Sequence, residues 1–496
     1  MSLLLLDRAQ QGHTNFRLSD GTAACRYGST EGILPARAPE PGEQYRFHFD
    51  MSKCIGCKCC EVACSEQNAN PVERSWRRVG EIEGGSYPFT QRFYLSMGCN
   101  HCLDAACLRG CPVDAYHKDE ATGIVLHSAD TCIGCQYCTW NCAYGVPQYN
   151  PERGVVGKCD MCHGRLAEGR EPACANACPE GAIQIELVNI AEWRADYAAA
   201  NAPGMPAAEY TVSTTRITLP ENLSPSMEKA DYHRVRPEHP HLPLVFMLVF
   251  TQLAVGAFLC LPIFQVTGMA AIAGPLAVAL LSLSSSMFHL GRPIHAYRAL
   301  KMWKRSWLSR EVLAFTLFAG AAQACALLQF LGWPVRPLEI GTALIGLTGI
   351  TASAFIYLVP ARPAWNSKHT VIDFHLTAWL LGPLFLAALG APVAPWLTLV
   401  AASAQLLNLV ARLIELTCSD EFELRASARL LGNDLKNLLT IRLVLLIGGG
   451  VALPLLHLPA AALLVATAGE LLSRYLFFVS VVPHNMAASF LRKEAA

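Results

Sequence analysis

Cysteine is the residue type in this chain with the clearest chemical capacity. Sixteen of the 21 cysteines fall in four short groups. A cubane iron–sulfur cluster is held by four thiolates, three from one short loop and a fourth from further along, which often serves the neighbouring cluster. The groups are Cys54-x2-Cys57-x2-Cys60-x3-Cys64, Cys99-x2-Cys102-x4-Cys107-x3-Cys111, Cys132-x2-Cys135-x2-Cys138-x3-Cys142 and Cys159-x2-Cys162-x11-Cys174-x3-Cys178. This spacing predicts four [4Fe–4S] clusters, enough for an electron-transfer chain.

Other uses of these cysteines fit less well. Structural zinc sites pair C-x2-C knuckles across a longer spacer, whereas three cysteines within seven residues would crowd a tetrahedral ion. Disulfides belong to small secreted domains. The string Cys159-Asp160-Met161-Cys162-His163 matches a haem-attachment motif, but both cysteines are needed to complete the fourth group. Of the five remaining cysteines, Cys59 is out of register with the first loop, so we interpret it as a non-ligand.

An internal repeat indicates a duplicated two-cluster ferredoxin. Cys54-Ile55-Gly56-Cys57 recurs as Cys132-Ile133-Gly134-Cys135, each followed by the same x2-C-x3-C spacing. The fourth cysteine of each group can then cross over to an adjacent group or to a distant one. The spacing leaves both possibilities open.

Composition changes sharply near residue 240. Eight apolar stretches follow, each about the 20 residues that a helix needs to cross the hydrocarbon core. They cover residues 242–264, 270–290, 311–333, 338–360, 372–391, 395–416, 438–458 and 460–482. The formal net charge of +0 is a sum over a polar part in water and an apolar part in lipid, and it indicates no nucleic-acid partner. We therefore expect a two-part fold: a duplicated ferredoxin-like α+β four-cluster domain, then an all-α eight-helix transmembrane bundle.

The basic residues of the loops predict the orientation of the bundle. The side that carries the N-terminus has Arg234, Arg236, Arg292, Arg298, Lys301, Lys304, Arg305, Arg310, Arg362, Lys368, Arg425, Arg429, Lys436, Arg492 and Lys493, and the opposite side has Arg336. The positive-inside rule then places the clusters in the cytoplasm and the bundle in the inner (cytoplasmic) membrane. Alternatively, these cations form a docking surface for the cluster domain. Met1–Asp7 has no twin arginine and does not resemble an export signal.

These patterns divide the chain into five parts. We expect an N-terminal extension at 1–45, the cluster domain at 46–200, a proline-rich linker at 201–240, the membrane anchor at 241–484 and a cytoplasmic tail at 485–496.

Two parts of the chain resemble subunits of a known enzyme family. Residues 46–190 resemble the iron–sulfur subunit of complex iron–sulfur molybdoenzymes, and residues 240–484 resemble the membrane anchor subunit of dimethyl sulfoxide reductase. The anchor signatures are Phe288-His289-Leu290-Gly291-Arg292-Pro293, Ser306-Trp307-Leu308-Ser309-Arg310-Glu311 and Pro360-Ala361-Arg362-Pro363-Ala364-Trp365-Asn366. The two parts are usually separate chains in this family, so this chain resembles a fusion.

The resemblance implies a partner and a ligand pattern. The partner is a separate catalytic subunit with a molybdenum or tungsten bis(pterin) cofactor, acting on a sulfur compound. The first three cysteines of group one would join Cys178, those of group four Cys64, those of group two Cys142, and those of group three Cys111. A cytoplasm-facing relative with a similar plan is the quinone-linked sulfite dehydrogenase, so the resemblance leaves the direction of electron flow open.

An electron-transfer chain that ends at a membrane needs a two-electron, two-proton carrier, and a quinone (menaquinone or ubiquinone) is the natural one. Ionisable groups within spans are costly and are functional candidates. Our first candidate for the quinone site is His289, because the family resemblance associates the histidine of the His-Leu-Gly motif with quinol binding. The second candidate is Glu311. The remaining candidates are Arg298, Arg310 and His375.

Two further interpretations concern the bundle. A haem b held by His289 and His375 is the runner-up cofactor, and a redox-driven ion-translocating module is the alternative function. Such a pump needs a chain of acidic residues through the membrane, and the spans show few. Glu470 and Arg474, at i and i+4, are expected to pair with each other, as are Arg412 and Glu415.

Overall fold

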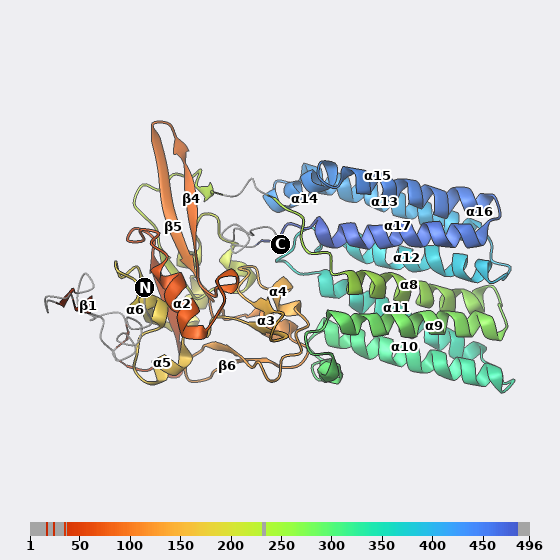
Figure 1. Cartoon of the computed structure of the whole chain (residues 1–496), viewed down its shortest axis with the longest axis horizontal. Helices are drawn as coiled ribbons and strands as arrows, with labels where there is room; N and C mark the ends of the chain where they lie inside the picture. Colours follow the sequence, from red (N-terminus) through yellow and green to blue (C-terminus); the bar gives the residue numbers. More distant parts are fainter. Residues whose placement is uncertain (1–15, 18–22, 25–33, 36, 231–234, 485–496) are drawn as a thin grey trace. The chain divides into compact units, whose positions relative to one another are not determined.

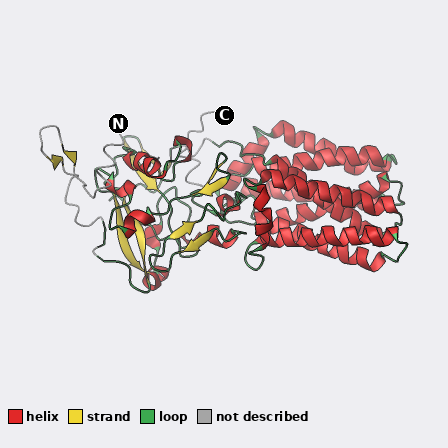
Figure 2. Ribbon diagram, turned by 60° about the horizontal axis from the view of Figure 1, so that its bottom comes forward, coloured by secondary structure: helices red, strands yellow, loops and turns green. Residues whose placement is uncertain are grey.

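The chain folds as two compact units, one formed by residues 1–234 with 484–496 and the other by Val235–Pro483. The computed structural model describes residues 16–17, 23–24, 34–35, 37–230 and 235–484. Strands occur in the first unit and long helices fill the second (Figure 2). Most of the expected extension 1–45, Arg234, Arg492, Lys493 and the tail from 485 lie outside the described residues.

A three-stranded sheet brings the two ends of the cluster region together. Its central strand β3 (Glu43–Asp50) pairs antiparallel with β10 (Ile183–Asn189) and parallel with β11 (Arg216–Thr218). Phe47 and Phe49 of β3 are buried on alternate positions, as the two-residue period of a strand requires. The pairing of Phe49 with Ile183 sets residues about 130 positions apart side by side.

A long hairpin is the second prominent feature of this unit (Figure 1). Its strands β4 (Arg78–Ser86) and β5 (Phe89–Met97) pair along their whole length, and β12 (Glu228–Lys229) joins β4. A Cβ on Gly84 would lie 2.6 Å from the Ser226 carbonyl oxygen, so the segment preceding β12 needs a glycine there to approach the hairpin.

Short elements connect these strands and carry most of the cysteine groups. The helices are α2 (Cys59–Asn68), α3 (Ala106–Gly110), α4 (Tyr137–Asn141), α5 (His163–Ala167), α6 (Ala173–Asn176) and α7 (Ile190–Ala195). The small strand pairs are β1 (Phe16–Arg17) with β2 (Ala23–Ala24), β6 (Tyr116–Lys118) with β7 (Val125–His127), and β8 (Gln148–Asn150) with β9 (Val155–Gly157). Helix α2 packs against α6, and α3 packs against α4.

The segment expected to be a linker differs from that expectation. Of residues 201–240, those up to 230 are part of the first unit. β11 adds to the central sheet, and the Thr214 and Thr215 hydroxyls donate to Asn100 at 2.6 and 2.9 Å. Proline-rich composition indicates irregular structure, but long-range strand pairing and buried threonine contacts fold this stretch onto the cluster region.

The second unit has eight helices long and apolar enough to span a membrane, as the sequence predicts. The spans are Leu242–Ile263, Met269–His289, Trp307–Phe330, Arg336–Tyr357, Lys368–Ala388, Trp396–Cys418, Lys436–Leu455 and Pro459–Val479. In the labels of Figure 1 these are α8, α9 with a 3-10 turn, α10, α11, α12, α13, α15 with α16, and α17. An additional short helix, α14 (Phe422–Gly432), lies between the sixth and seventh spans.

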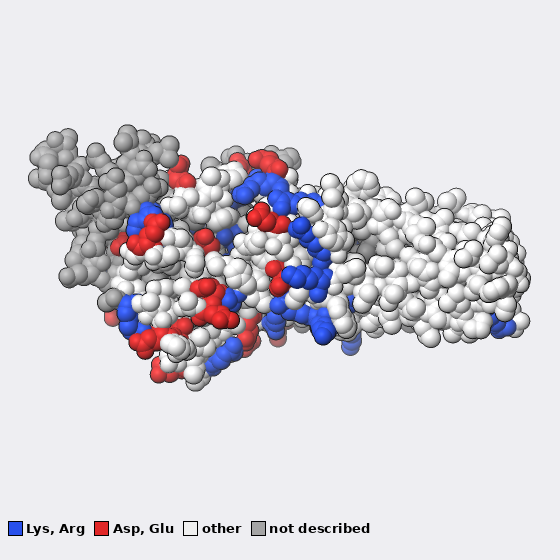
Figure 3. Space-filling model, turned by 90° about the horizontal axis from the view of Figure 1, so that it is seen from below, with Lys and Arg blue, Asp and Glu red and all other residues white. Residues whose placement is uncertain are grey.

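Helices α8 and α12 form the centre of the bundle. Most of α8 is buried. A Cβ on Gly256 of α8 would lie 2.0 Å from the Ala378 carbonyl oxygen, and one on Gly382 of α12 would lie 2.1 Å from the Gly256 carbonyl carbon. Small residues let spanning helices approach closely and gain van der Waals contact. The visible flank of the bundle is almost entirely free of charged side chains (Figure 3).

Candidate functional site

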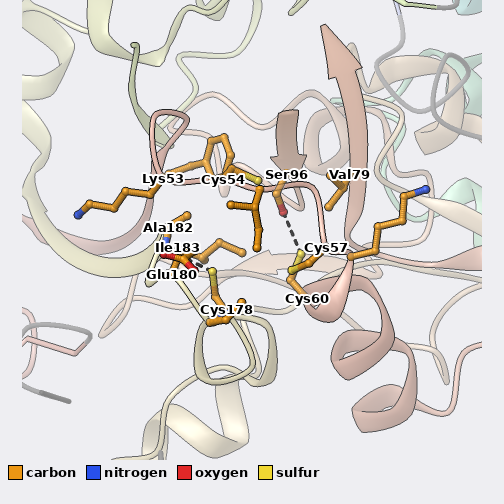
Figure 4. A pocket seen from close by; sticks show the side chains of 14 residues that line it. Lys53, Cys54, Cys57, Cys60, Val79, Ser96, Cys178, Glu180, Ala182 and Ile183 are labelled. Carbon is orange, nitrogen blue, oxygen red and sulfur yellow. Dashed lines mark hydrogen bonds between the residues drawn. The ribbon is translucent and has the colours of Figure 1, made fainter. Parts of the chain in front are cut away.

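Cysteines from the first and fourth groups line one cavity, here called site 1. They are Cys54, Cys57 and Cys60, which follow β3, and Cys178, which precedes β10 (Figure 4). The antiparallel pairing of these strands explains the meeting, because the end of β3 and the start of β10 lie side by side. The structure thus brings together the four residues that the family resemblance implies for one cluster.

A second cavity, site 2, is lined by Cys99, Cys102, Cys107 and Cys142. Helix α3 carries Cys107 and packs against α4, which directly precedes Cys142. The Thr211 hydroxyl donates to the Cys102 sulfur at 3.1 Å. The segment first expected to be a linker therefore contributes to this site.

The other eight of the sixteen grouped cysteines form two further sets of four in space. Burial raises the pKa of Cys64 well above its ordinary value, and the thiols around it that raise the pKa further are Cys159, Cys174 and Cys162, which together form site 4. Burial likewise raises the pKa of Cys138, with Cys135, Cys132 and Cys111 as its neighbours, which together form site 3. In both sites the fourth cysteine comes from a partner group, because α2 packs against α6 and α3 against α4.

The repeated loops have the same backbone conformation. Gly56 and Gly134 both have φ of 69°, and two residues later Lys58 and Gln136 have φ of 60° and 59°. Such angles lie in the left-handed region that favours glycine. At Gly56 a Cβ would also lie 2.6 Å from the Tyr94 ring. Both loops therefore curl in the same way immediately before α2 and α4.

Hydrogen-bond donors surround the sulfur atoms. Burial raises the pKa of the Cys60 thiol to about 12, while the Arg77 cation and the Ser96 hydroxyl act in the opposite direction. Hydrogen bonds to the charged form of a group favour that form. Backbone N–H groups donate to Cys111 (from Ala115, 3.3 Å), Cys132 (Gly134, 3.4 Å), Cys159 (Met161, 3.4 Å) and Cys178 (Ala182, 3.3 Å). The loops are therefore arranged to stabilise thiolates.

Electrostatic interactions between cysteines indicate which sites are neighbours. Cys174 of site 4 raises the pKa of Cys60 of site 1, and Cys99 of site 2 raises the pKa of Cys159 of site 4. Tyr116 lies beside both Cys107 of site 2 and Cys138 of site 3. These interactions support the order 1–4–2–3.

The residues present fit iron–sulfur clusters. Sets made only of thiolates suit soft metals and iron–sulfur clusters. Buried nitrogen atoms next to the cysteine groups also have no hydrogen-bond partner among the described residues; they are Nε and Nη2 of Arg77 and Nε2 of His101. A cluster supplies one-electron redox chemistry, and the chain supplies the thiolates and the donors around it.

Comparison with known proteins supports the predicted iron–sulfur domain and the predicted membrane anchor. Residues 90–187 match the 4Fe-4S dicluster domain, and residues 237–480 match the DMSO reductase anchor subunit (DmsC). The probable anaerobic dimethyl sulfoxide reductase chain YnfG of Escherichia coli K12 is 40% identical over 197 residues, which cover 38% of this chain and 95% of that protein. This protein belongs to the dimethyl sulfoxide reductase family.

Two further relatives support the same conclusion. The B subunit of the anaerobic dimethyl sulfoxide reductase of E. coli K12 is 39% identical over 197 residues, 38% of this chain and 95% of that protein. The formate dehydrogenase-O iron–sulfur subunit of E. coli K12 is 37% identical over 179 residues, 32% of this chain and 59% of that protein. The chain thus fuses a ferredoxin-like [4Fe–4S] domain to a multi-pass anchor, and it serves electron transfer and membrane anchoring of a molybdoenzyme.

The structure places one other histidine of the dimethyl sulfoxide reductase-like anchor, His241, beside His289. The His289 ring lies 5.1 Å from that of His241, which lies 4.8 Å from His239 and 5.7 Å from Phe478. Burial, with the nearby His289, His239 and Arg362, lowers the pKa of His241 to about 2. His241 is therefore a neutral imidazole that can donate or accept a hydrogen bond. Sequence reasoning missed it because it precedes the first span, although His239 and His241, both within three residues of that span, were a usable signal.

The other candidates have separate surroundings. Glu311 is buried on α10 beside Ser353 of α11, and His375 Nε2 of α12 lies 3.2 Å from the Thr351 hydroxyl. The two arginines contact aromatic rings. Arg310 stacks on Trp307 at 4.2 Å and donates to backbone carbonyls, and Arg298 lies 5.9 Å from the Tyr297 ring.

Two ion pairs were expected within single helices of the anchor, Glu470 with Arg474 and Arg412 with Glu415, and both predictions are wrong. Arg474 Nη1 lies 2.5 Å from Asp373 Oδ2, and its Nη2 donates to Gln252 and Thr377 at 3.1 and 3.0 Å. Glu470 accepts from the Thr377 hydroxyl at 2.6 Å. Side chains from three helices thus converge on one buried polar cluster, since a charge within lipid needs an ionic partner and the neighbouring helix supplies a better placed one.

The second pair differs in the same way. Glu415 Oε2 lies 2.9 Å from His369 Nε2, and Arg412 donates to the Ala364 carbonyl at 3.2 Å.

Proposed function

We propose that this chain conducts electrons between the membrane quinone pool and a separate molybdopterin catalytic subunit through four [4Fe–4S] clusters at sites 1, 4, 2 and 3, in that order. The observation that carries the proposal is the set of four contiguous cysteine quartets in a chain that also holds an eight-span anchor. Clusters that adjoin one another form a continuous path for single electrons.

Site 1 is the terminus for the catalytic partner. Cys57 is exposed, and the apolar side chains beside it, Ile55 and Val62, are 57% and 61% exposed. Exposed apolar residues around a redox centre are typical of a docking surface. The other terminus, site 3, then exchanges electrons with the quinone.

The quinone headgroup binds at His289, with neutral His241 beside it as a second hydrogen-bonding group. A quinone gains two protons on reduction and releases them on oxidation, so its carbonyl oxygens need partners that can hold a proton. Glu311, His375, Arg298 and Arg310 are secondary candidates for proton transfer or headgroup contact.

The substrate of the partner is a sulfur compound. The relatives of the first half include subunits of dimethyl sulfoxide reductases, which supports quinol oxidation coupled to reduction of an S-oxide. The loops favour a cytoplasm-facing cluster domain in the inner membrane, because basic residues gather on the side that carries the N-terminus. That orientation favours a second candidate, sulfite oxidation with quinone reduction, in which electrons run the other way.

Electron paramagnetic resonance on the complete complex tests the direction. Starting from oxidised clusters, we expect reduced-cluster signals after quinol is added, and loss of those signals after dimethyl sulfoxide is added. Signals after sulfite alone would instead establish the dehydrogenase. Failure of both quinol and sulfite to reduce the clusters would refute the proposal.

The His289→Arg variant tests the quinone site. We expect it to abolish reduction of the clusters by quinol while iron content stays normal. The matched control is His457→Arg, at the exposed turn before the last span. Normal quinol kinetics in the His289 variant would refute the assignment.

A further inference from the structure

Two fully buried cations lie at the junctions between cysteine sites, and the proposed electron path does not by itself explain them. Arg77 and Lys158 are 2% and 3% exposed. Lysine and arginine are rarely buried this deeply unless an anion compensates their charge. Cysteine thiols act on the charge of both side chains, and the Asp160 carboxylate also acts on Lys158. We therefore expect much of the compensating charge to come from the clusters.

Arg77 lies at the junction of sites 1 and 4. Its guanidinium stacks on Phe47 at 4.5 Å, and Nη1 donates to the backbone oxygen and the hydroxyl of Ser96 at 3.3 and 3.2 Å. The same hydroxyl lies 3.3 Å from the Cys60 sulfur of site 1. The other nitrogens of the guanidinium, Nε and Nη2, are buried and have no hydrogen-bond partner within the described part of the chain.

Electrostatics place thiols from both sites around this guanidinium. Burial by itself lowers the pKa of Arg77, but Cys174, Cys60, Cys159 and Cys64 raise it above the ordinary value. Cys60 belongs to site 1, and the other three belong to site 4. The two unpartnered nitrogens are therefore free to face cluster or thiolate sulfur.

Lys158 lies at the next junction, between sites 4 and 2. Its ammonium lies 3.7 Å from the Cys99 sulfur of site 2 and donates to the backbone oxygen of Cys159 of site 4 at 2.7 Å. It also donates to the Val125 carbonyl. These contacts fix a positive charge between two sites that adjoin in the proposed path.

A fixed cation changes the redox balance of a neighbouring cluster. A cubane held by four thiolates is an anion, and reduction adds one more negative charge. Cluster potential depends on net charge, hydrogen bonds to sulfur and solvent exposure. A unit charge about 8 Å away, in a medium with an effective dielectric constant of about 20, favours the added electron by more than tenfold.

We propose that Arg77 and Lys158 are positioning residues of the electron path, which raise the reduction potentials of the clusters at sites 1, 4 and 2 and offset the repulsion between adjacent reduced clusters. This inference rests on the proposed four-cluster function. The cluster at site 3 is the internal reference, since its thiols surround Cys138 beyond the two junctions.

Redox titration of the full complex, monitored by electron paramagnetic resonance with chemical mediators, tests the inference. We expect Lys158→Met and Arg77→Met to shift the reduced-to-oxidised ratio of at least one junction cluster at least tenfold toward oxidised, which is about 59 mV for one electron. Iron and labile sulfide per chain should be unchanged. Arg77→Lys keeps the charge and should keep wild-type midpoints. Arg92→Met, on an exposed hairpin pair with Glu83 at 3.3 Å, is the control.

The outcomes separate tuning from a structural role. Unshifted midpoints in both methionine variants with full iron content would overturn the inference, and so would loss of iron in both Arg77→Lys and Lys158→Met. The titration uses mediators and needs neither quinol nor a sulfur substrate. A wrong proposed function would instead appear as fewer than four clusters in the wild-type protein, or as clusters that quinol and sulfite both fail to reduce.

Discussion

The crossed ligand pattern gives a sharp prediction about iron content. In the structure Cys178 lines a cavity with Cys54, whereas Cys174, only four residues earlier, belongs with Cys64. Each serine substitution is expected to damage one cluster of four, with loss of about one to four of roughly sixteen iron atoms per chain.

Pairs of substitutions reveal which cysteines share a cluster. Cys54→Ser with Cys178→Ser removes two ligands from one site, so the double variant should lose at most about the four iron atoms of a single cluster. Cys174→Ser with Cys178→Ser strikes two sites, so its losses should add. Substitutions at independent sites are additive, and those within one unit are not.

The assay is iron and labile sulfide per chain in purified complex, with spin quantitation of each cluster. The control is Cys59→Ser, since Cys59 is exposed and lies outside the four quartets. Additive losses for Cys54 with Cys178, together with non-additive losses for Cys174 with Cys178, would refute the crossed arrangement and assign the fourth group to a cluster of its own.

Three further predictions concern single contacts. Gly382→Ala would place a Cβ 2.1 Å from the Gly256 carbonyl carbon, so we expect a loss of about 1–3 kcal/mol or more in detergent unfolding experiments, with Gly320→Ala, which meets open space, as the neutral control. Asp373→Asn leaves Arg474 and Arg442 buried without their carboxylate, so we expect it to lower the free energy of unfolding by about 3–5 kcal/mol in the same assay. The control is Asp420→Asn, at an exposed position, which should change this free energy little. Equal losses in the two variants would contradict the buried ion pair. Thr211→Ala removes a hydroxyl that donates to the Cys102 sulfur at 3.1 Å, so the reduction potential of the site 2 cluster should fall. The control is Thr90→Ala, at an exposed position, which should leave that potential unchanged. An unaltered midpoint in Thr211→Ala would show that this hydrogen bond has no influence.

Local features of this protein could be predicted from its sequence alone. Cysteine spacing within a loop and the hydrophobic length of a span depend on a few neighbouring residues, so the iron–sulfur domain and all eight spans were predictable. The span boundaries differ by up to four residues, as at Trp307 and Lys368, where the first turn of the helix holds charged residues and precedes the continuous apolar stretch. Cys59, expected not to be a ligand, stands at the exposed start of α2.

Long-range partners were decided by the tertiary structure. The spacing left the fourth cysteine of each group free to go either way, and strand pairing between β3 and β10 with the packing of α2 on α6 sets which thiols meet. The same holds for Arg474, which pairs with Asp373 on another helix rather than with its near neighbour Glu470. The burial of Arg77 and Lys158 likewise depends on what surrounds them in space. Sequence determines which groups are present and how each segment meets its solvent; folding determines which distant groups share a low-dielectric site, because those contacts depend on the whole chain at once.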